Sequence, residues 1–167
     1  MRKQPAQLEG GTGKQRGFSL VELLIVVSVI LIIAAIAIPN FIRSKMRANE
    51  SSAVQNLRTI TTANTVYAIT YSIGFAGTLA TLGGNTVIVD STAAGLIDSV
   101  LSTGAKAGYS YTYTVTASGG GGQVVSYAVT AEPTTVGSTG ERYFYTDERC
   151  IIRQNNSGPA GANDSPI

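Results

Sequence analysis

The residues that could carry out chemistry are few in this chain of 167 residues. Histidine is absent and Cys150 is the single cysteine, so the chain can build neither a Cys/His metal site nor a Ser-His or Cys-His catalytic pair. Two sets of carboxylates, Asp90 with Asp98 and Asp147 with Glu148, lack the alternating acidic residues of a calcium-binding loop, and we interpret them as solvated turns. We therefore predict no catalytic residue, no metal ligand, no cofactor and no enzymatic activity.

The charged residues are unevenly distributed along the chain. The net charge is only +2, which gives no reason to expect nucleic acid as a partner. Residues 1–17 hold four basic side chains against Glu9, so the rest of the chain sums to −1. Charged residues make up 13% of the chain and 19 residues are glycine. We interpret this composition as that of an extracytoplasmic, β-rich domain rather than a cytosolic enzyme.

One acidic residue, Glu22, lies in an otherwise apolar segment. Residues 18–38 read FSLVELLIVVSVILIIAAIAI, and only Ser19, Glu22 and Ser28 interrupt this run of 21 residues. A run of this length can cross a bilayer as a helix. An ionised carboxylate within a bilayer is costly unless it finds a partner or stays hydrated near the interface. Glu22 is therefore the residue of this segment whose chemistry needs an explanation.

Composition and periodicity divide the chain into four segments. Residues 1–17 are polar and basic, without apolar periodicity, and are predicted to be unstructured. Residues 18–39 form the apolar helix, whose uninterrupted run ends at Pro39. Residues 40–73 are predicted to continue as an amphipathic helix, and residues 74–167 to form a β-rich head with a flexible C-terminal tail.

The amphipathic segment carries apolar residues at steps of three, four and seven, which lie on one face of a helix. This stripe consists of Met46, Ala53, Leu57, Ile60 and Tyr67, broadened by Val54. The side chains between them are expected to face solvent, and they are Arg47, Glu50, Gln55 and Arg58. We predict one long helix from about Phe18 to about Tyr71, packed through its second half against an antiparallel sheet.

The clearest strand pattern is a hairpin in the second half of the chain. Residues 109–117, YSYTYTVTA, alternate with period two, and residues 123–131, QVVSYAVTA, return after a run of glycines. The alternation places the side chains of Tyr109, Tyr111, Tyr113 and Val115 on one face. We expect most of the tyrosines to pack between the sheet and the helix.

The remaining strand patterns are weaker. Residues 86–90, TVIVD, are a short β-branched candidate, and residues 142–146 and 150–154 flank a charged turn that predicts a second hairpin. Because Cys150 has no intramolecular partner, this second hairpin is expected to secure the end of the domain in place of a disulfide. Residues 155–167 are rich in Asn, Ser, Gly and Pro and are predicted to fray.

The junction between the basic residues and the apolar run resembles a known processing signal. Residues 17–41, GFSLVELLIVVSVILIIAAIAIPNF, are similar to the prepilin signal of type IV pilins, particularly those of type IVa, and of type II secretion pseudopilins. The resemblance implies an α+β pilin fold, with a long N-terminal α-helix packed on a C-terminal antiparallel β-sheet. It also implies that residues 1–17 are a leader, that a prepilin peptidase cuts between Gly17 and Phe18, and that Phe18 is then N-methylated.

The same resemblance implies roles in assembly for Phe18, Glu22 and Pro39. Glu22 is expected to pair with the new N-terminal amine of a neighbouring Phe18, which would fix the axial offset between two apolar helices. Pro39 either kinks a membrane helix or marks a local unwinding in the filament, and both interpretations stay open.

The basic group Arg43, Lys45 and Arg47 could contact phospholipid head groups before assembly or line the outer filament core.

The implied function is that of a structural subunit of an extracellular type IV pilus-like filament. Basic residues before an apolar segment hold that end in the cytoplasm, so residues from Asn40 onward are expected outside a single-pass span of the inner membrane. The expected partners are other copies of the chain in a helical filament, the prepilin peptidase and the inner-membrane assembly machinery. The alternatives are a type II secretion pseudopilin and a membrane-anchored binding module.

Overall fold

The computed structural model describes residues 17–84 and 89–167. The leader predicted at 1–17 therefore lies almost wholly outside the described residues, as does most of the strand predicted at 86–90. The chain forms two compact units, one ending at Pro39 and the other comprising Asn40–Ile167. Each unit is described by itself below.

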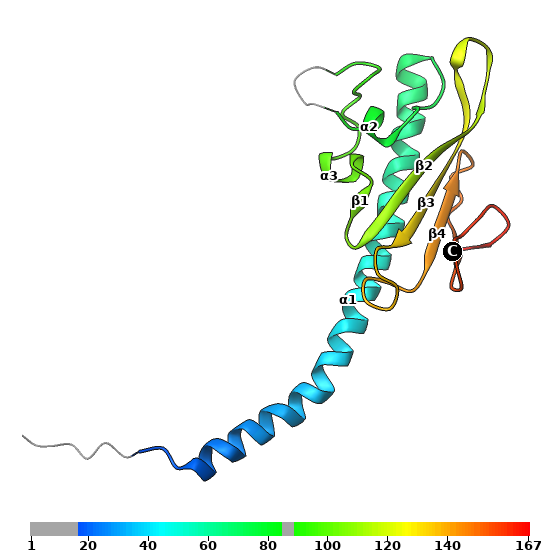
Figure 1. The fold of residues 1–167 in the computed structure, drawn as a ribbon. Helices are drawn as coiled ribbons and strands as arrows, with labels where there is room; N and C mark the ends of the chain where they lie inside the picture. The colour runs from blue at the N-terminus through cyan, green and yellow to red at the C-terminus, as the bar shows by residue number, and fades with distance from the viewer. Residues whose placement is uncertain (1–16, 85–88) are drawn as a thin grey trace, which may run out of the picture. The chain divides into compact units, whose positions relative to one another are not determined.

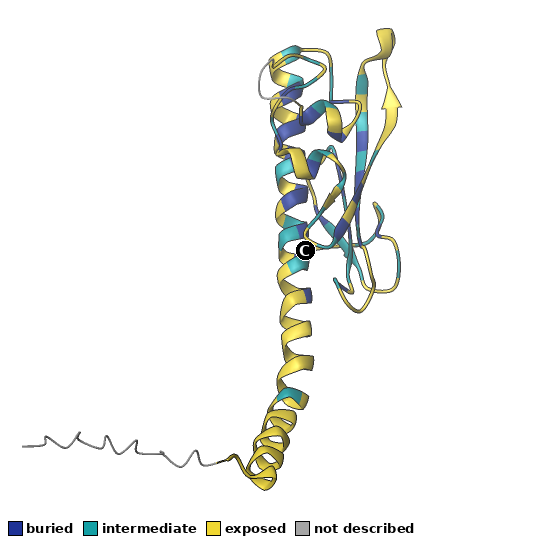
Figure 2. Cartoon of the chain, turned by 60° about the vertical axis from the view of Figure 1, so that its left-hand side comes forward, coloured by how far each residue is buried: buried dark blue, intermediate teal, exposed yellow. Residues whose placement is uncertain are grey.

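Helix α1 spans Leu20–Tyr71 and contains Pro39 in its interior (Figure 1). Long apolar and amphipathic runs without glycine favour a helix of this length. Its first residues, up to Pro39, are all exposed except Ala34, which is half-buried. Its buried residues begin only at Met46 (Figure 2). The predicted helix from Phe18 to Tyr71 is confirmed to within two residues at its start.

The second unit holds a six-stranded antiparallel sheet in the order β1-β2-β3-β4-β5-β6. The strands are β1 Ala105–Lys106, β2 Tyr109–Ser118, β3 Val124–Pro133, β4 Tyr143–Asp147, β5 Arg153–Asn155 and β6 Ser165–Pro166. Two short helices, α2 Leu79–Leu82 and α3 Ser99–Ser102, precede the sheet, and a 3-10 turn, η1 Gly120–Gly122, joins β2 to β3. The fold is α+β, with the second part of α1 packed on the sheet, as predicted.

The core confirms the predicted apolar stripe. Met46, Ala53, Leu57, Ile60 and Tyr67 are all buried, while Val54 is half-buried beside them. The inward face of β2 supplies Tyr109 and Tyr111, and the rings of Tyr113 and Tyr127 stack with their centroids 5.3 Å apart. Leucines of α2 and α3 close the same core. The expected packing of tyrosines against the helix is therefore found for most of them.

Two asparagines are buried on this face of α1, although the apolar pattern did not include them. The Nδ2 of Asn56 donates to the hydroxyl of Tyr111 at 2.8 Å. The Oδ1 of Asn64 accepts from the hydroxyl of Tyr113 at 3.1 Å and from the N–H of Ala76 at 3.2 Å. Buried polar groups that find partners fix one arrangement of the packed elements, so these contacts set the position of the helix along the sheet.

The first hairpin follows the prediction closely. Tyr111 lies opposite Ala131 and Tyr113 opposite Val129 across β2 and β3. The turn contains Gly121 and Gly122 with φ of 74° and 82°, a backbone conformation that favours glycine. The run of four glycines therefore provides the turn that the hairpin needs.

The second hairpin differs from the prediction in the bounds of its strands. Strand β4 pairs with β5, but β5 begins at Arg153 rather than at residue 150. The N–H of Cys150 donates to the carbonyl of Asp147 at 2.9 Å, and Cys150 has a φ of 60°, so the turn extends through Cys150. Ile152 is buried in the core instead of continuing a ladder. The turn is tightened by Asp147, which is only 7% exposed and therefore not solvated as expected.

The C-terminal residues 155–167 are more ordered than their composition suggests. Strand β6 pairs with β5, and Ala160 is buried. Asp164 holds this loop, because its side chain accepts from the N–H of Gly161 at 2.8 Å and from the Nδ2 of Asn155 at 3.2 Å. A single carboxylate thus satisfies two donors of a segment that has few apolar residues.

Candidate assembly site

The first turn of α1 is organised around Glu22. Its Oε2 accepts a hydrogen bond from the backbone N–H of Ser19 at 2.9 Å. The carbonyl oxygen of Ser19 in turn accepts from the N–H of Leu23 at 3.2 Å. Ser19 and Glu22 have the spacing, and one of the two hydrogen bonds, of a capping box. The carboxylate also complements the positive end of the helix dipole.

This local role of Glu22 was missed by sequence reasoning. The Ser-x-x-Glu spacing of Ser19 and Glu22 signals a helix N-terminus, but the sequence interpretation of Glu22 considered only hydration near the interface and pairing with another chain. The structure places the carboxylate beside the peptide bond that joins Phe18 to Ser19. Within a single chain, Glu22 therefore already lies next to the predicted new N-terminus.

The apolar surface that follows is fully formed and uncovered. Phe18 and Leu20 are 80% and 79% exposed, and every Val, Leu and Ile from Val21 to Ile38 is at least 44% exposed. Ser28 does not interrupt the apolar surface, since its Oγ donates to the carbonyl of Leu24 at 2.7 Å. In the described part of the chain, α1 is the one helix long and apolar enough to cross a membrane. An apolar surface of this extent marks an interaction site.

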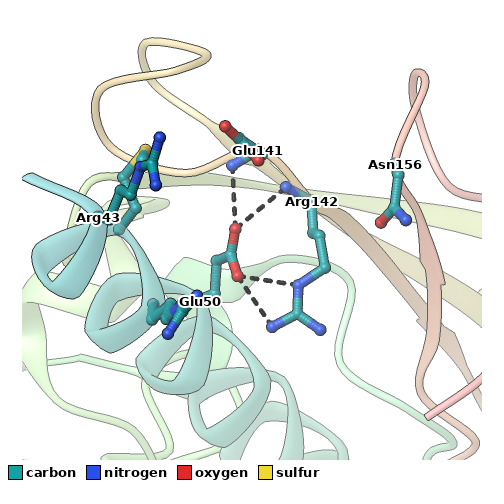
Figure 3. A pocket seen from close by; sticks show the side chains of 7 residues that line it. Arg43, Glu50, Glu141, Arg142 and Asn156 are labelled. Atoms are coloured by element: carbon teal, nitrogen blue, oxygen red, sulfur yellow. Dashed lines mark hydrogen bonds and ion pairs between the residues drawn. The ribbon is translucent and has the colours of Figure 1, made fainter. Parts of the chain in front are cut away.

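A second cluster forms where α1 passes the start of β4 (Figure 3). The Oε2 of Glu50 lies 2.8 Å from both the Nε and a terminal nitrogen of Arg142. Its Oε1 accepts from the N–H groups of Glu141 and Arg142 at 3.0 and 3.3 Å. The guanidinium of Arg142 also donates to Gln154 at 2.9 Å and lies over the ring of Phe144. The pair thus joins the helix to two strands.

The position of Glu50 corrects the prediction that it faces solvent. Its side chain is only 8% exposed, because Arg142 and the backbone before β4 supply the partners that a buried carboxylate needs. Burial raises the pKa of Glu50, but the hydrogen bonds from Glu141 and Arg142 and the charge of Arg142 outweigh it, so the pKa lies below its ordinary value of 4.5. Glu50 is therefore charged at neutral pH.

A pocket of about 510 Å³ adjoins this pair. Its walls come from α1, from the two residues before β4 and from the segment between β5 and β6. The lining residues are Arg43, Met46, Arg47, Glu50, Glu141, Arg142 and Asn156. This pocket is thus lined by two of the three basic residues that the sequence analysis identified, Arg43 and Arg47.

The first turn and the apolar surface can be compared with known proteins. Residues 12–38 match the prokaryotic N-terminal methylation motif. A stretch of 50 residues, 30% of this chain, is 54% identical to the type IV major pilin protein PilA of Myxococcus xanthus and covers 23% of that protein. A stretch of 36 residues, 22% of this chain, is 50% identical to the type IV wide pilus major component PilA4 of Thermus thermophilus and covers 28% of it.

The N-terminal segment of the chain is therefore similar to that of type IV pilins. A stretch of 58 residues, 35% of the chain, is 33% identical to the type II secretion system core protein G of Escherichia coli and covers 40% of it. The chain thus spans less than half the length of each of these relatives. No solved structure matches it.

The pilin-like segment contains most of the predicted site residues. Gly17, Phe18 and Glu22 lie inside the methylation-motif match, and Pro39 follows one residue beyond it. The structure brings Phe18, Ser19 and Glu22 together at the start of α1, whereas Pro39 lies inside the helix at the boundary between the two units. Cleavage, methylation and pairing between chains remain predictions for these residues.

The carboxylates Asp90 and Asp98, interpreted from the sequence as solvated turns, make separate local contacts. Asp90 accepts from the N–H and hydroxyl of Thr92 at 2.8 and 2.6 Å. Asp98 caps α3 and pairs with Lys106 at 2.7 Å. Among residues 17–84 and 89–167, no group of three or more His, Cys, Asp or Glu side chains could hold a metal ion. The contacts of Asp90 and Asp98 stabilise local structure.

Proposed function

We propose that this chain is a structural subunit of an extracellular type IV pilus-like filament, polymerised through the first half of α1. The observation that carries the proposal is the uncovered apolar surface from Phe18 to Ile42. Most of this surface lies within the methylation-motif match at residues 12–38. Such a surface needs either lipid or other protein around it. Copies of the same helix, packed together, provide that cover outside the membrane.

The proposed sequence of events begins with a membrane-inserted precursor. The basic leader keeps its end in the cytoplasm, α1 crosses the inner membrane, and the head from Asn40 onward lies outside. A prepilin peptidase then cuts between Gly17 and Phe18 and methylates Phe18. The assembly machinery of the inner membrane transfers the mature chain into the filament, where its role is structural rather than enzymatic.

Glu22 is proposed to select the offset between neighbouring helices. Apolar contacts alone are nondirectional and allow one helix to slide along another. After cleavage, the ammonium group of Phe18 and the carboxylate of Glu22 are the two ionised groups of residues 18–38. In a surrounding of low dielectric constant, the pairing of opposite charges is strong. The capping bond to Ser19 holds the carboxylate at the end of α1, where a neighbour's amine can reach it.

A second candidate function is that of a type II secretion pseudopilin. The similarity to core protein G of Escherichia coli favours it, because that match covers a larger share of its relative than the matches to the two pilins do. Both functions use the same N-terminal segment. They differ in whether the filament extends from the cell surface.

The experiment that tests the proposal is to shear filaments from cells and determine the mass and N-terminal sequence of the released subunit. We expect residues 18–167 with one added methyl group on Phe18. An extracellular filament whose subunit keeps the leader, or begins after Pro39, would contradict the processing step. Processed chain that stays with the cells and is needed for secretion would instead establish the pseudopilin function.

A further inference from the structure

The pocket between α1 and the residues before β4 has an unbalanced arrangement of charge. At its floor, Glu50 and Arg142 neutralise one another through two contacts of 2.8 Å. This leaves Arg43 and Arg47, which lie on α1, and the exposed Glu141, which precedes β4. Figure 3 shows Arg43 on the helix and Glu141 on the neighbouring segment. The pocket therefore offers two positive groups and one negative group to a ligand.

Within the described residues, the two arginines lack partners of opposite charge. They are four residues apart on α1, which places their side chains next to one another on the helix surface. The ion pairs among residues 17–84 and 89–167 are Lys106–Asp98 and Arg142–Glu50, so neither guanidinium has a carboxylate within 4.0 Å in the part of the chain that the structure describes. Two arginines that lie about one helical turn apart and lack a carboxylate partner can together donate several hydrogen bonds to a phosphate group.

The position of the arginines along the chain indicates where such a phosphate would come from. Arg43 directly follows Ile42, the end of the exposed apolar run. Residue 47 lies only about 8 Å along the helix from residue 42. The polar head-group layer of a bilayer is roughly 5–8 Å thick on each side. When the apolar segment crosses a bilayer, both arginines therefore lie at the depth of the phospholipid head groups.

We propose that, before assembly, this pocket binds the head group of a zwitterionic phospholipid with a primary ammonium group, such as phosphatidylethanolamine. The phosphodiester is held by the guanidinium groups of Arg43 and Arg47, and the ammonium group by the carboxylate of Glu141. The amide of Asn156 lines the same pocket and adds a polar contact. This inference rests on the membrane-inserted precursor of the proposed function and specifies its lipid contact.

The structure supports selective rather than general attraction to lipid. The Glu50–Arg142 pair holds the backbone N–H groups of residues 141 and 142 at 3.0 and 3.3 Å, so the segment that carries Glu141 has a fixed position relative to α1. A carboxylate whose backbone is held near the two arginines favours a zwitterion over a purely anionic lipid. The bound lipid would hold the head against the membrane surface until the chain enters the filament.

The test is native mass spectrometry of the full chain in a neutral detergent. The probes are phosphatidylethanolamine, phosphatidylglycerol and diacylglycerol with identical acyl chains. We expect the wild-type chain to retain phosphatidylethanolamine and to release diacylglycerol. The double variant Arg43→Gln/Arg47→Gln should retain about fivefold less phosphatidylethanolamine. Arg58→Gln, an exposed arginine on α1 that does not line the pocket, is the matched control and should retain it normally.

A second variant, Glu141→Gln, tests the ammonium contact. It should lower retention of phosphatidylethanolamine but not of phosphatidylglycerol. Three results would each overturn the proposal: equal retention by the double variant and Arg58→Gln, equal retention of diacylglycerol, or displacement of the lipid by an equal concentration of inorganic phosphate. The third result would show a site for free anions. A double variant with normal lipid retention but few filaments would instead assign Arg43 and Arg47 to contacts between copies.

Failure of this inference can be separated from failure of the proposed function. Cleavage after Gly17 and the yield of sheared filaments are measured on the wild-type chain and do not depend on the pocket. If the wild-type chain forms filaments but its lipid retention does not depend on Arg43 and Arg47, only the proposed head-group site is rejected. If the wild-type chain forms no filaments, the proposed function itself is rejected.

Discussion

The two halves of α1 are both rich in apolar residues, yet only the second is buried by its own chain. From Met46 to Tyr67 the apolar side chains recur on one face and pack on the sheet. From Phe18 to Ile38 they surround the helix and are exposed. The difference teaches that periodicity, rather than hydrophobicity, decides whether a helix packs in its own domain. A helix that is apolar all round needs lipid or other chains.

The largest expected effect concerns the uncovered half. Glu22→Ala should leave insertion and cleavage at Gly17 intact but reduce sheared filaments to few or none, because no charge then selects the offset between helices. Glu22→Gln sharpens this test, since its amide oxygen can still accept from the N–H of Ser19 while the charge is lost. We expect equally few filaments from Glu22→Gln.

The control for the Glu22 variants is Ser28→Ala, which removes another polar group of the same segment and should assemble normally. Filament yield is measured by shearing and quantifying the subunit. Normal yield from Glu22→Ala would show that the charge does not set the offset. Normal yield from Glu22→Gln alone would assign Glu22 to capping of the helix.

The packed half is tested by removing a core side chain. Leu57 is fully buried, so Leu57→Ala should lower the free energy of unfolding of the head by about 3 kcal/mol. Ile32→Ala removes a similar side chain that is 64% exposed and should change that free energy by less than about 0.5 kcal/mol. Denaturant unfolding of the full chain in detergent measures both. Equal losses would contradict the distinction between the two halves.

The ion pair that joins α1 to the sheet gives a smaller effect. Glu50→Gln should lower the free energy of unfolding by about 2 kcal/mol, because the charged hydrogen bonds to Arg142 are weakened. Gln55→Ala, on the exposed side of the same helix, is the control and should be near neutral. A neutral Glu50→Gln would show that the pair positions the helix without stabilising it.

The same pair predicts a dependence on pH. Since the folded pKa of Glu50 lies below its ordinary value of 4.5, the stabilisation by the charged carboxylate is fully present above the unfolded pKa and is lost as the pH falls through the folded pKa. The difference in unfolding free energy between wild type and Glu50→Gln should therefore be constant above about pH 6 and shrink below about pH 4.5. A difference that is equally large at pH 3 would contradict this assignment.

The smallest expected effect concerns the C-terminal loop. Asp164→Ala should remove the contacts to Gly161 and Asn155 and destabilise the head by about 1 kcal/mol. It should also increase hydrogen exchange at residues 160–167, while the core strands stay protected. Unchanged exchange in this segment would show that pairing of β6 with β5 holds the loop without Asp164.

The sequence alone determined the long helix, its uncovered first half and the resemblance to pilin-type proteins. These features follow from local patterns: the apolar run of residues 18–38, the stripe ending at Tyr67 and the alternation of residues 109–117. Each depends on residues close together in the chain, whose periodicity directly reports secondary structure. Glu22 could also be recognised from the sequence, because an acidic residue within an apolar run stands out without knowledge of the fold.

The tertiary structure alone decided which polar residues are buried. Glu50 was expected in solvent because its surroundings in the sequence are polar, but Arg142 approaches it from the sheet, 92 residues away. Asn56 and Asn64 are likewise buried because tyrosines of β2 supply their partners. The turn at Cys150 and the loop held by Asp164 depend on particular backbone hydrogen bonds. Contacts between residues far apart in the chain produce no periodicity in the sequence. The pocket beside Glu50 could therefore not be predicted from the sequence, because it exists only where the helix packs against the sheet.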